Sequence, residues 1–520
     1  MTFTGSLLPY QPEAVEAMCE RGKMLVAYDL GLGKTVLTIA AIEQLMDQQK
    51  ITEPGIVICL SSLKYQWADQ IRKFTDGSST PLVIDGTPKQ RAEQYQQAFD
   101  WGHSLVDYVI INYEQVVNDW EYVRQLPTGF IVCDEATAIK SFRSKRSKYV
   151  KKLKSDYKFA LTGTPVENGK PEELYSIMQF VDNSLLGRFD LFDQTFIVRN
   201  RFGGVDRYRN LPLLNTTLSK ACVRKRQSDP DVAPYLPETI FAEPILIQFD
   251  STSAKLYKSI ANEILADLDE AMESYGANFD IFTHYGQANS WEGADALRGK
   301  IMSKLTALRM LCDHPMLLEH SSFSSGYAAE LKETGRLDKV TKSPKLSALK
   351  EYVDNFLGEY EGNKIVIFTS YVHMVDIIRE TLLSDWGSTP YTGEMNAKSK
   401  EESKLSFQTD PSIRILVSSD AGGYGVDLPQ ANLLINYDLP WNAGLAVQRN
   451  GRIRRASSTW TSIVIQDFLM EGSIEERQHA MLQQKIAIAT AVVDGEGIDD
   501  KGGVALTAGS LRAFLQNITV

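Results

Sequence analysis

The chain has 520 residues, of which 43% are hydrophobic and 23% are charged, a composition typical of globular proteins. This length predicts two or more domains. No apolar run approaches the roughly 18 residues that a membrane span needs, and the first residues lack a signal-peptide pattern, so we expect a cytoplasmic protein. The five cysteines are never closely paired, which argues against a disulfide framework and against a cysteine-rich zinc module.

The net charge of −11 does not favour a nucleic-acid-binding protein, but the local distribution of charge matters more than the sum. Residues 140–158 contain nine lysines or arginines and one acid, and residues 199–226 are also basic. Runs of like charge are usually solvated faces, so their meaning depends on the motifs that lie beside them.

Residues 1–165 alternate apolar, strand-like runs with helical patterns, which predicts a parallel sheet covered by helices on both faces. Phosphate sites in such sheets lie at the C-terminal ends of the strands. The expected strands are residues 24–27, 55–60, 108–112, 130–133 and 158–161.

The first strand runs into a glycine-rich turn, YDLGLGKT, and a helical pattern follows at once. Strand, loop and helix in this order predict a phosphate-binding loop, because backbone N–H groups and the helix dipole converge on an anion. Gly31 and Gly33 let the backbone approach phosphate. Lys34 would reach the outer phosphates, and the Thr35 hydroxyl would bind Mg²⁺. The first position of the usual pattern is not glycine, and an ordinary strand-to-helix turn is the alternative.

Two carboxylates, Asp134 and Glu135, end another apolar strand. Beside a phosphate loop, Asp134 would hold Mg²⁺ and Glu135 would orient and polarise the attacking water, as phosphoryl transfer requires. A surface pair at a strand end is the alternative. Residues 162–165 (TGTP) end the next strand, where small hydroxyl side chains can relay a change at the γ-phosphate.

Residues 166–345 are dominated by amphipathic helical stretches such as 254–272 and 298–311, with a strand signal chiefly at 239–248. Residues 346–490 return to the alternation, so the sequence predicts two similar α/β halves with a helical insertion at their junction. Strands of the second half are expected at residues 364–368, 414–418, 432–436 and 461–466.

Three further features lie beyond the first half. In QRNGRIRR, residues 448–455, arginines lie along one helix face, and guanidinium groups suit phosphate oxygens, although a basic surface helix is the alternative. Cys312 and His314 lack a second pair of metal ligands, so we interpret them as structural. After an acidic loop, Thr507 can cap a final helix at 511–517.

Together these segments resemble those of the helicase superfamily two ATPases, and more narrowly the Swi/Snf-type double-stranded-DNA translocases. The resemblance runs from about residue 6 to about residue 485. About two hundred residues separate motifs III and IV, which is more than strand-separating relatives usually have. The matching segments are 8–11 (entry motif), 28–35 (motif I), 61–67 (motif Ia), 110–114, 134–137 (motif II), 139–141, 162–165 (motif III), 308–315 (LRMLCDHP), 343–346 (SPKL), 364–371 (motif IV), 418–428 (motif V), 437–442 (YDLPWN) and 448–455 (motif VI).

The resemblance implies an α/β fold of two RecA-like parallel-sheet lobes with helical protrusions between motifs III and IV. The expected domains are lobe 1 at 1–165, its helical protrusion at 166–229, a linker at 230–240, the helical protrusion of lobe 2 at 241–345, lobe 2 at 346–490, and an acidic loop with the C-terminal helix at 491–520.

The resemblance also implies ATP and Mg as cofactors, and a monomer that binds duplex or branched DNA through the DNA backbone, without sequence specificity. The residues implied for catalysis are Lys34, Asp134, Glu135 and the motif VI fingers Arg452 and Arg455. Those implied for nucleotide binding are Gln11 at the adenine edge, Gly31, Gly33, Lys34, Thr35, Gly425, Asp427 and Gln448, with Thr35 and Asp134 on Mg²⁺. Those implied for DNA are Ser62, Lys140, Lys145, Thr164, Ser370, Gly422 and Trp441.

The chain departs from the family pattern at several positions. Thr137 replaces the usual motif II histidine, Leu60 replaces the motif Ia proline, and residues 456–458 (ASS) replace Ile-Gly-Gln. Tyr28 stands where relatives commonly carry an acid; it would line the nucleotide pocket or, as we expect, pack beneath the loop. No chromatin-reading or RING module fits in this length, so we expect a bare motor, as in bacterial and phage members.

The sequence therefore predicts a translocase whose DNA-stimulated ATP hydrolysis drives movement along duplex or branched DNA. A strand-separating helicase of the same superfamily is one alternative, because motif VI also resembles the spelling of unwinding relatives. A DNA-binding scaffold that has lost hydrolysis is the alternative from another class, and the intact Lys34, Asp134 and Glu135 argue against it.

Overall fold

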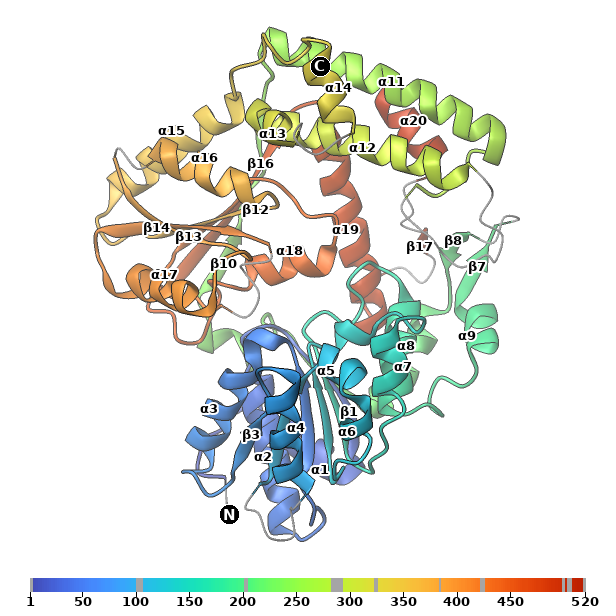
Figure 1. The fold of residues 1–520 in the computed structure, drawn as a ribbon, viewed down its shortest axis with the longest axis vertical. Helices are drawn as coiled ribbons and strands as arrows, with labels where there is room; N and C mark the ends of the chain where they lie inside the picture. The colour runs from blue at the N-terminus through green and yellow to red at the C-terminus, as the bar shows by residue number, and fades with distance from the viewer. Residues whose placement is uncertain are drawn as a thin grey trace. The chain divides into compact units, whose positions relative to one another are not determined.

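The computed structural model describes residues 3–99, 106–200, 204–281, 293–321, 326–382, 385–420, 426–497, 501–502 and 507–517 (Figure 1). The chain divides into two compact units. Unit 1 comprises Met1–Val198, Tyr208–Leu236 and Lys485–Lys501, and unit 2 comprises Arg199–Arg207, Pro237–Gln484 and Gly502–Val520. Among the described residues, no helix is both long enough and apolar enough to cross a membrane.

Unit 1 is built on a parallel sheet of seven strands in the order β3-β4-β2-β5-β6-β1-β9. Fully buried apolar runs form its central strands, and helices lie between consecutive strands in the chain (Figure 1). The strands are β1 (Lys23–Tyr28), β2 (Gly55–Cys59), β3 (Pro81–Val83), β4 (Tyr108–Asn112), β5 (Ile131–Asp134), β6 (Lys158–Leu161) and β9 (Cys222–Lys225).

The other elements of this half of the chain are mostly short. The helices are α1 (Pro12–Arg21), α2 (Lys34–Asp47), α3 (Lys64–Phe74), α4 (Pro88–Phe99), α5 (Tyr113–Asn118), α6 (Trp120–Val123), α7 (Lys145–Val150), α8 (Pro171–Val181), α9 (Phe189–Phe196) and α10 (Leu211–Leu218). Short strands are β7 (Ile197–Arg199) and β8 (Val205–Tyr208), and 3-10 turns are η1 (Ser61–Leu63), η2 (Ala136–Ile139), η3 (Ser219–Ala221) and η4 (Ala233–Tyr235).

The five strands predicted for the first half are confirmed as β1, β2, β4, β5 and β6, within one or two residues at each end. The range 166–229, predicted as a helical protrusion, needs one correction. Its residues Cys222–Lys225 form β9, which pairs in parallel with β1 and is the edge strand of the sheet. Pairing with β1 satisfies backbone hydrogen-bonding groups of this basic segment, so the segment is part of the lobe 1 sheet and not of a protrusion.

Unit 2 has a second parallel sheet, in the order β10-β16-β15-β12-β14-β13, and β11 also pairs with β16. The four strands predicted for the second half are confirmed as β12, β14, β15 and β16, and the signal at 239–248 corresponds to β10 and β11. The strands of this sheet are β10 (Glu238–Phe241), β11 (Ile245–Ile247), β12 (Ile365–Thr369), β13 (Gly387–Tyr391), β14 (Ile413–Ser419), β15 (Leu433–Asn436) and β16 (Ser462–Met470). The short β17 (Lys501–Gly502) belongs to a separate three-stranded sheet in the order β17-β8-β7.

The predicted linker and the predicted protrusion of lobe 2 therefore also need correction. β10 begins inside the range 230–240 and β11 lies inside 241–345, and both strands belong to the sheet of unit 2 rather than to a linker or a helical insertion. The helices of this part of the chain are α11 (Ser251–Tyr275), α12 (Ala294–Asp313), α13 (Pro315–Ser321), α14 (Tyr327–Glu333), α15 (Pro344–Glu359), α16 (Val372–Leu382), α17 (Ala397–Thr409), α18 (Ala443–Asn450), α19 (Ile474–Val493) and α20 (Ala508–Gln516).

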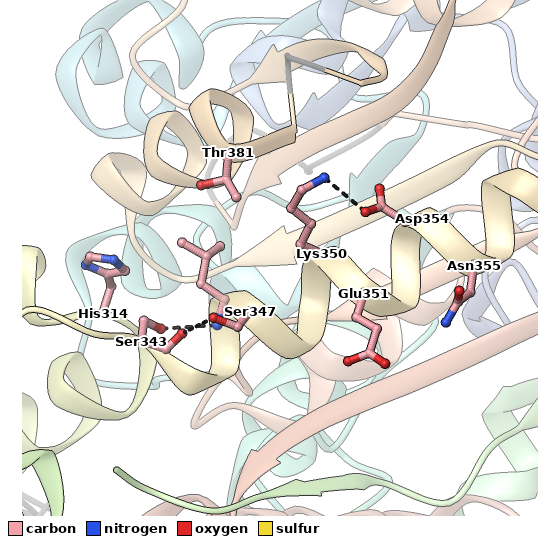
Figure 2. Close-up of a pocket in the computed structure, with 9 residues that line it drawn as sticks. His314, Ser343, Ser347, Lys350, Glu351, Asp354, Asn355 and Thr381 are labelled. Atoms are coloured by element: carbon pink, nitrogen blue, oxygen red, sulfur yellow. Dashed lines mark hydrogen bonds and ion pairs between the residues drawn. The ribbon is translucent and has the colours of Figure 1, made fainter. Parts of the chain in front are cut away.

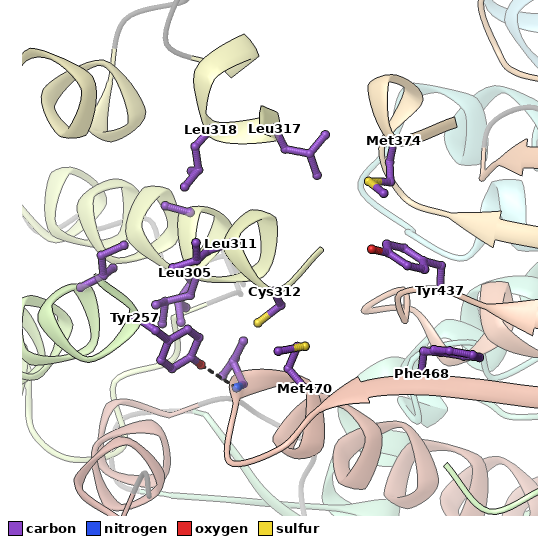
Figure 3. Close-up of a cluster of buried hydrophobic side chains, with 14 of the residues drawn as sticks. Tyr257, Leu305, Leu311, Cys312, Leu317, Leu318, Met374, Tyr437, Phe468 and Met470 are labelled. Atoms are coloured by element: carbon purple, nitrogen blue, oxygen red, sulfur yellow. Dashed lines mark hydrogen bonds between the residues drawn. The ribbon is translucent and has the colours of Figure 1, made fainter. Parts of the chain in front are cut away.

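The helical segment α11–α14 shares one hydrophobic core with a face of the unit 2 sheet (Figure 3). Cys312 lies in this core among Leu311, Tyr437 and Met470, and the Tyr257 hydroxyl accepts a hydrogen bond from a backbone N–H of α19. The structural interpretation of Cys312 is consistent with this burial. Within the described part of the chain, no three histidine, cysteine or acidic side chains are grouped as metal ligands.

Thr507 caps α20 as predicted. Its side chain accepts a hydrogen bond from the backbone N–H of Ser510, whose own side chain accepts one from the backbone N–H of Thr507, so the two residues form a capping box. The predicted final helix therefore exists and begins about one turn earlier than expected.

Candidate active site

The loop between β1 and α2 has the backbone conformation that a phosphate-binding loop needs. Gly31 and Gly33 have φ values of 79° and 81°, the left-handed region that favours glycine. A Cβ atom on Gly33 would clash with Nε2 of Gln11, so this position excludes side chains for a second reason. Thr35 lies in the first turn of α2, where backbone N–H groups and the helix dipole favour an anion.

Lys34 spans this loop. Its Nζ donates hydrogen bonds to the carbonyl oxygens of Tyr28 at 2.9 Å and of Asp29 at 3.2 Å. A cation, a glycine cradle and a hydroxyl at a helix N-terminus form a donor set that fits the phosphates of ATP and a Mg²⁺ ion.

Gln11 connects the entry segment to the loop. Its Oε1 accepts a hydrogen bond from the Leu8 backbone N–H at 2.8 Å, and its Nε2 donates to the Leu32 carbonyl at 2.9 Å. The carboxamide is buried against the loop, so Gln11 fixes the loop backbone. Its contact with adenine stays a prediction.

Tyr28 packs beneath the loop, as we expected. It is buried, its hydroxyl donates a 3.0 Å hydrogen bond to the Tyr10 carbonyl, and the two rings lie 6.4 Å apart. Burial raises the pKa of Tyr28, so the phenol stays protonated. The aromatic side chain at this position therefore supports the loop from below.

Asp134 is the last residue of β5, which lies two strands from β1 in the sheet, and Glu135 follows it. Asp134 Oδ2 accepts a 2.8 Å hydrogen bond from the Trp67 indole N–H, and Oδ1 accepts one from the Glu135 backbone N–H at 3.0 Å. Burial raises the pKa of Asp134, and the bond from Trp67 and the charge of Lys34 oppose that rise. Since β1 and β5 both pair in parallel with β6, their C-terminal ends bring the phosphate loop and Asp134 to the same edge of the sheet.

Residues 162–164 lie against the same loop. The Thr164 backbone N–H donates to the Thr162 hydroxyl at 3.1 Å, and a Cβ on Gly163 would lie 3.1 Å from the side chain of Leu30. The Thr164 hydroxyl is buried and has no hydrogen-bond partner among the described residues. This turn therefore packs against the phosphate loop, and its role in relaying a change at the γ-phosphate stays a prediction.

Sequence reasoning missed the residues that hold the loop from the side of β9. Arg224 Nη1 donates to Asp29 Oδ1 at 2.5 Å. The Gln227 backbone N–H donates to Asp29 Oδ2 at 2.9 Å, and Gln227 Nε2 donates to the Leu30 carbonyl at 2.7 Å. The basic run 199–226 was the signal that pointed here, and for Arg224 it marks a structural partner of the loop.

The predicted arginine fingers belong to unit 2. Arg455 is buried, its Nε donates to Asp427 Oδ1 at 2.6 Å, and its Nη1 donates to the Gly451 carbonyl. Arg452 is also buried, and the carboxamide oxygen of Gln448 is buried without a hydrogen-bond partner in the described part of the chain. Gly422 and Gly425 lie outside the described residues.

Arg449, which lies in α18 just before the predicted fingers, has a structural role. Its side chain is 1% exposed, and its guanidinium donates to Asp420 at 2.6 Å, to the Asp438 carbonyl at 2.5 Å and to the Ser370 hydroxyl at 3.1 Å. Ser370 in turn donates to Asp438 at 2.5 Å. The hydroxyl and the backbone N–H of Ser370 therefore both donate to the Asp438 carboxylate. The DNA contact of Ser370 stays a prediction.

The predicted DNA-contact residues of unit 1 fall into two groups. Ser62 and Lys145 are exposed, and Lys145 begins α7. Lys140, by contrast, forms an ion pair with Glu167, a residue that sequence reasoning did not single out. Burial lowers the pKa of Lys140, but the charges of Glu167 and Glu173 raise it by more. The Lys140 ammonium is therefore ion-paired within the protein, and its DNA contact stays a prediction.

In unit 2, the predicted DNA-contact residue Trp441 is partly buried, and the guanidinium of Arg309 lies 5.4 Å from the centre of its ring. A cavity of about 520 Å³ opens along α15 in the same unit (Figure 2). The Lys350 ammonium at its wall is paired with Asp354 at 3.0 Å, and the hydroxyls of Ser343 and Ser347 donate to backbone carbonyls. None of the predicted site residues lines this cavity.

Comparison with known proteins identifies the family. Residues 10–317 match the SNF2-related domain, and residues 344–457 match the helicase conserved C-terminal domain. The putative ATP-dependent helicase/translocase YwqA of Bacillus subtilis is 25% identical over 504 residues, covering 95% of this chain and 50% of that protein. The human DNA repair and recombination protein RAD54-like is 24% identical over 534 residues, covering 94% of this chain and 66% of that protein. The chain therefore spans about half to two thirds of these two relatives.

The fold agrees with this relationship. The helicase domain of Hef from Pyrococcus furiosus has a similar structure, with a TM-score of 0.53 and 17% identity, covering 91% of this chain and 97% of that one. At this identity the likeness concerns the fold, and it agrees with two α/β lobes of the RecA type. The chain belongs to the SNF2-related, Snf2-type ATPases of helicase superfamily two.

Proposed function

We propose that this chain is a motor that couples ATP hydrolysis to movement along duplex DNA. The observation that carries the proposal is that the glycine-rich loop with Lys34, at the end of β1, and the buried Asp134 carboxylate, at the end of β5, lie at the same edge of the parallel unit 1 sheet. Family membership supports the reaction class. Two relatives, one named a helicase/translocase and the other a DNA repair and recombination protein, support DNA as the substrate.

In this proposal, the loop backbone and Lys34 bind the outer phosphates of ATP. Thr35 and Asp134 would hold Mg²⁺, which when bound neutralises charge on the phosphates. Glu135 orients and polarises a water molecule for attack on the γ-phosphorus, and the bond from phosphorus to the ADP oxygen breaks to release ADP and phosphate.

Arg452 and Arg455 would supply positive charge to the transferring phosphate when the two lobes close on ATP. Such arginine fingers contribute roughly 10³–10⁵ in rate in other phosphoryl-transfer enzymes. Closure is a hinge motion, which the nucleotide favours only by binding the closed form better. Hydrolysis without DNA should therefore be weak, because the fingers are then poorly placed.

Exposed basic side chains of the α7 segment support a DNA-binding role. Arg143, Lys145, Lys148 and Lys152 are all exposed, and the segment follows motif II in the chain. Side chains of this type bind backbone phosphates without reading sequence, so the affinity for DNA should fall steeply with salt.

An ATPase assay over a panel of DNA structures tests the proposal. We expect duplex or branched DNA to stimulate turnover at least tenfold more than single-stranded DNA of equal length. Glu135→Gln should bind duplex DNA like the wild type and hydrolyse no ATP. A wild-type chain that hydrolyses no ATP with any DNA would favour the scaffold alternative and contradict the proposal.

A further inference from the structure

A chain of ion pairs joins the phosphate loop to the segment that follows α19. Arg224 lies at its centre, where Nη1 donates to Asp29 Oδ1 at 2.5 Å and Nε donates to Asp494 Oδ1 at 2.7 Å. All three residues belong to unit 1, although Asp494 is 270 positions from Arg224 in the chain. One guanidinium therefore bridges an acid of the ATP site and an acid near the end of the chain.

The bridge is shielded from water. The side chain of Asp494 is 8% exposed and that of Arg224 is 21% exposed, so salt and solvent screen their attraction less than at an open surface. Burial lowers the pKa of Arg224, but the charges of Asp29 and Asp494 raise it by more. The guanidinium stays charged, and besides the two carboxylates it donates to the Ala27 carbonyl of β1 at 2.8 Å.

The end of α19 is built in a way that fixes the position of Asp494. The last carbonyls of a helix lack intrahelical partners, and here Asn215 Nδ2 donates to those of Val492 and Val493 at 3.2 and 2.8 Å. Gly495 has a φ of 71°, and a Cβ there would lie 2.8 Å from Asn215 Oδ1. Arg224 also lies where the α19 dipole favours a cation.

The loop side of the bridge is equally defined. Gln227 holds the other carboxylate oxygen of Asp29 at 2.9 Å and the Leu30 carbonyl at 2.7 Å. Lys34 donates to the carbonyl of the same Asp29 at 3.2 Å. A shift of Arg224 would move Asp29, and with it the backbone that Lys34 and the phosphates share.

We propose that Asp494, acting through Arg224, is a positioning residue for the ATP-binding loop. The segment after α19 holds the guanidinium in the orientation that fixes Asp29, and so sets the affinity of the loop for nucleotide. This inference rests on the proposed ATP hydrolysis, and it assigns a role in the ATP site to a part of the chain beyond the helicase C-terminal domain.

The test uses the full chain without DNA. A fluorescent ATP analogue with Mg²⁺ is titrated against the wild type and Asp494→Asn, which keeps the shape of the side chain and removes its charge. We expect roughly five- to twentyfold weaker binding of the analogue. In a separate ATPase assay with saturating duplex DNA, we expect a matching rise in the KM for ATP and a kcat within about twofold of wild type, because the lost interaction acts on binding. Arg224→Lys should act in the same direction, since an ammonium cannot bridge both acids as a guanidinium does.

Glu496→Gln is the matched control. Glu496 lies two residues beyond Asp494 and accepts a 2.5 Å hydrogen bond from Arg226. The Arg226 side chain also pairs with Asp229 and, among the described residues, makes no hydrogen bond to the loop. We expect nucleotide binding within about twofold of wild type. Unchanged binding in Asp494→Asn, a fall in kcat with unchanged binding, or equal weakening in Glu496→Gln would each overturn the proposal. If the wild type binds ATP but duplex DNA does not stimulate its ATP hydrolysis, the proposed motor function is contradicted, and the binding test of Asp494 stays valid.

Discussion

The indole N–H of Trp67 donates a 2.8 Å hydrogen bond to Oδ2 of Asp134, so a buried aromatic residue of α3 holds the carboxylate implied for Mg²⁺ binding. Burial raises the pKa of Asp134, and this hydrogen bond opposes the rise because it stabilises the ionised form. The motif Ia segment is therefore connected to motif II through one side-chain contact.

Trp67→Phe should raise the pKa of Asp134 further, because it removes a donor to the charged form. A carboxyl with a higher pKa protonates sooner as the pH falls, so the acid limb of the ATPase pH profile should shift to higher pH. The half-saturating Mg²⁺ concentration should also rise.

The pH profile of DNA-stimulated hydrolysis, recorded at several Mg²⁺ concentrations, checks both effects. Trp120→Phe is the control, since Trp120 packs edge-to-face against Tyr149, lies 5.5 Å from the Lys152 ammonium and, among the described residues, makes no hydrogen bond to Asp134. An acid limb that stays at the wild-type pH in Trp67→Phe would argue against the role of this hydrogen bond.

Arg455→Ala should lower the single-turnover rate of ATP hydrolysis by about 10³-fold or more, with nucleotide affinity in the absence of DNA near that of wild type. The reason is that a finger stabilises charge that develops in the transition state. Arg455→Lys should not restore the rate, because lysine lacks the planar fork. Wild-type turnover in Arg455→Ala would remove this residue from the catalytic set.

Glu167→Gln should strengthen binding of duplex DNA. The substitution removes the carboxylate that pairs with Lys140, and the released ammonium can then contact a phosphate. We expect roughly threefold higher affinity at low salt and a log–log salt slope that is steeper by about 0.9, the value for one added phosphate contact. Fluorescence anisotropy of labelled duplex measures both quantities.

Glu121→Gln controls for the change in net charge, since Glu121 is exposed and, within the described part of the chain, forms an ion pair only with Arg124. If both variants alter the salt slope equally, Lys140 does not contribute a specific phosphate contact.

Tyr28→Phe separates the two roles considered for this side chain. Loss of the 3.0 Å hydrogen bond to the Tyr10 carbonyl leaves a buried acceptor unpaired, so the free energy of unfolding should fall by about 0.5–1.5 kcal/mol. Because the ring packs beneath the loop, the KM for ATP should stay within about twofold of wild type. A large rise in KM at unchanged stability would place the hydroxyl in the nucleotide pocket instead.

Lys345→Met should destabilise unit 2 strongly. The Lys345 ammonium is fully buried and pairs with Asp313 at 2.9 Å and Glu475 at 2.6 Å, which connects the SPKL segment to α12 and α19. Removal of the cation leaves two buried carboxylates without it, at a cost of about 3–5 kcal/mol.

Lys350→Met is the matched control for this cluster. Lys350 lies one and a half turns further along α15, also pairs with two acids, and is 31% exposed, so its loss should cost less than about 1 kcal/mol. Urea unfolding of both variants gives the comparison, and similar losses would show that burial of the Lys345 cluster has no special weight.

Much of the fold could be predicted because the central strands are local apolar runs with buried side chains on both faces. Of the edge strands, β3, β9 and β13 could not. β3 has only three residues, β13 contains Pro390, and β9 is a basic segment whose strand character depends on pairing with β1 nearly two hundred residues earlier.

The candidate site shows the same division. Lys34, Thr35, Asp134 and Glu135 could be predicted because each lies in a contiguous segment whose spacing carries the chemistry. The partners that hold them could not be predicted, because each contact joins residues far apart in the chain. Trp67 and Asp134 are 67 positions apart, Arg224 and Asp29 are 195 apart, and Asp494 and Arg224 are 270 apart. Tertiary contacts alone bring these groups together.

The most direct test of the proposed function is displacement of the third strand from a DNA triplex, run beside unwinding of a forked duplex. A motor that tracks along duplex DNA should displace the third strand with ATP, and Glu135→Gln should not displace it. The wild-type motor should leave the two strands of the forked duplex paired. Unwinding of the fork without displacement of the third strand would contradict the account and identify a strand-separating helicase.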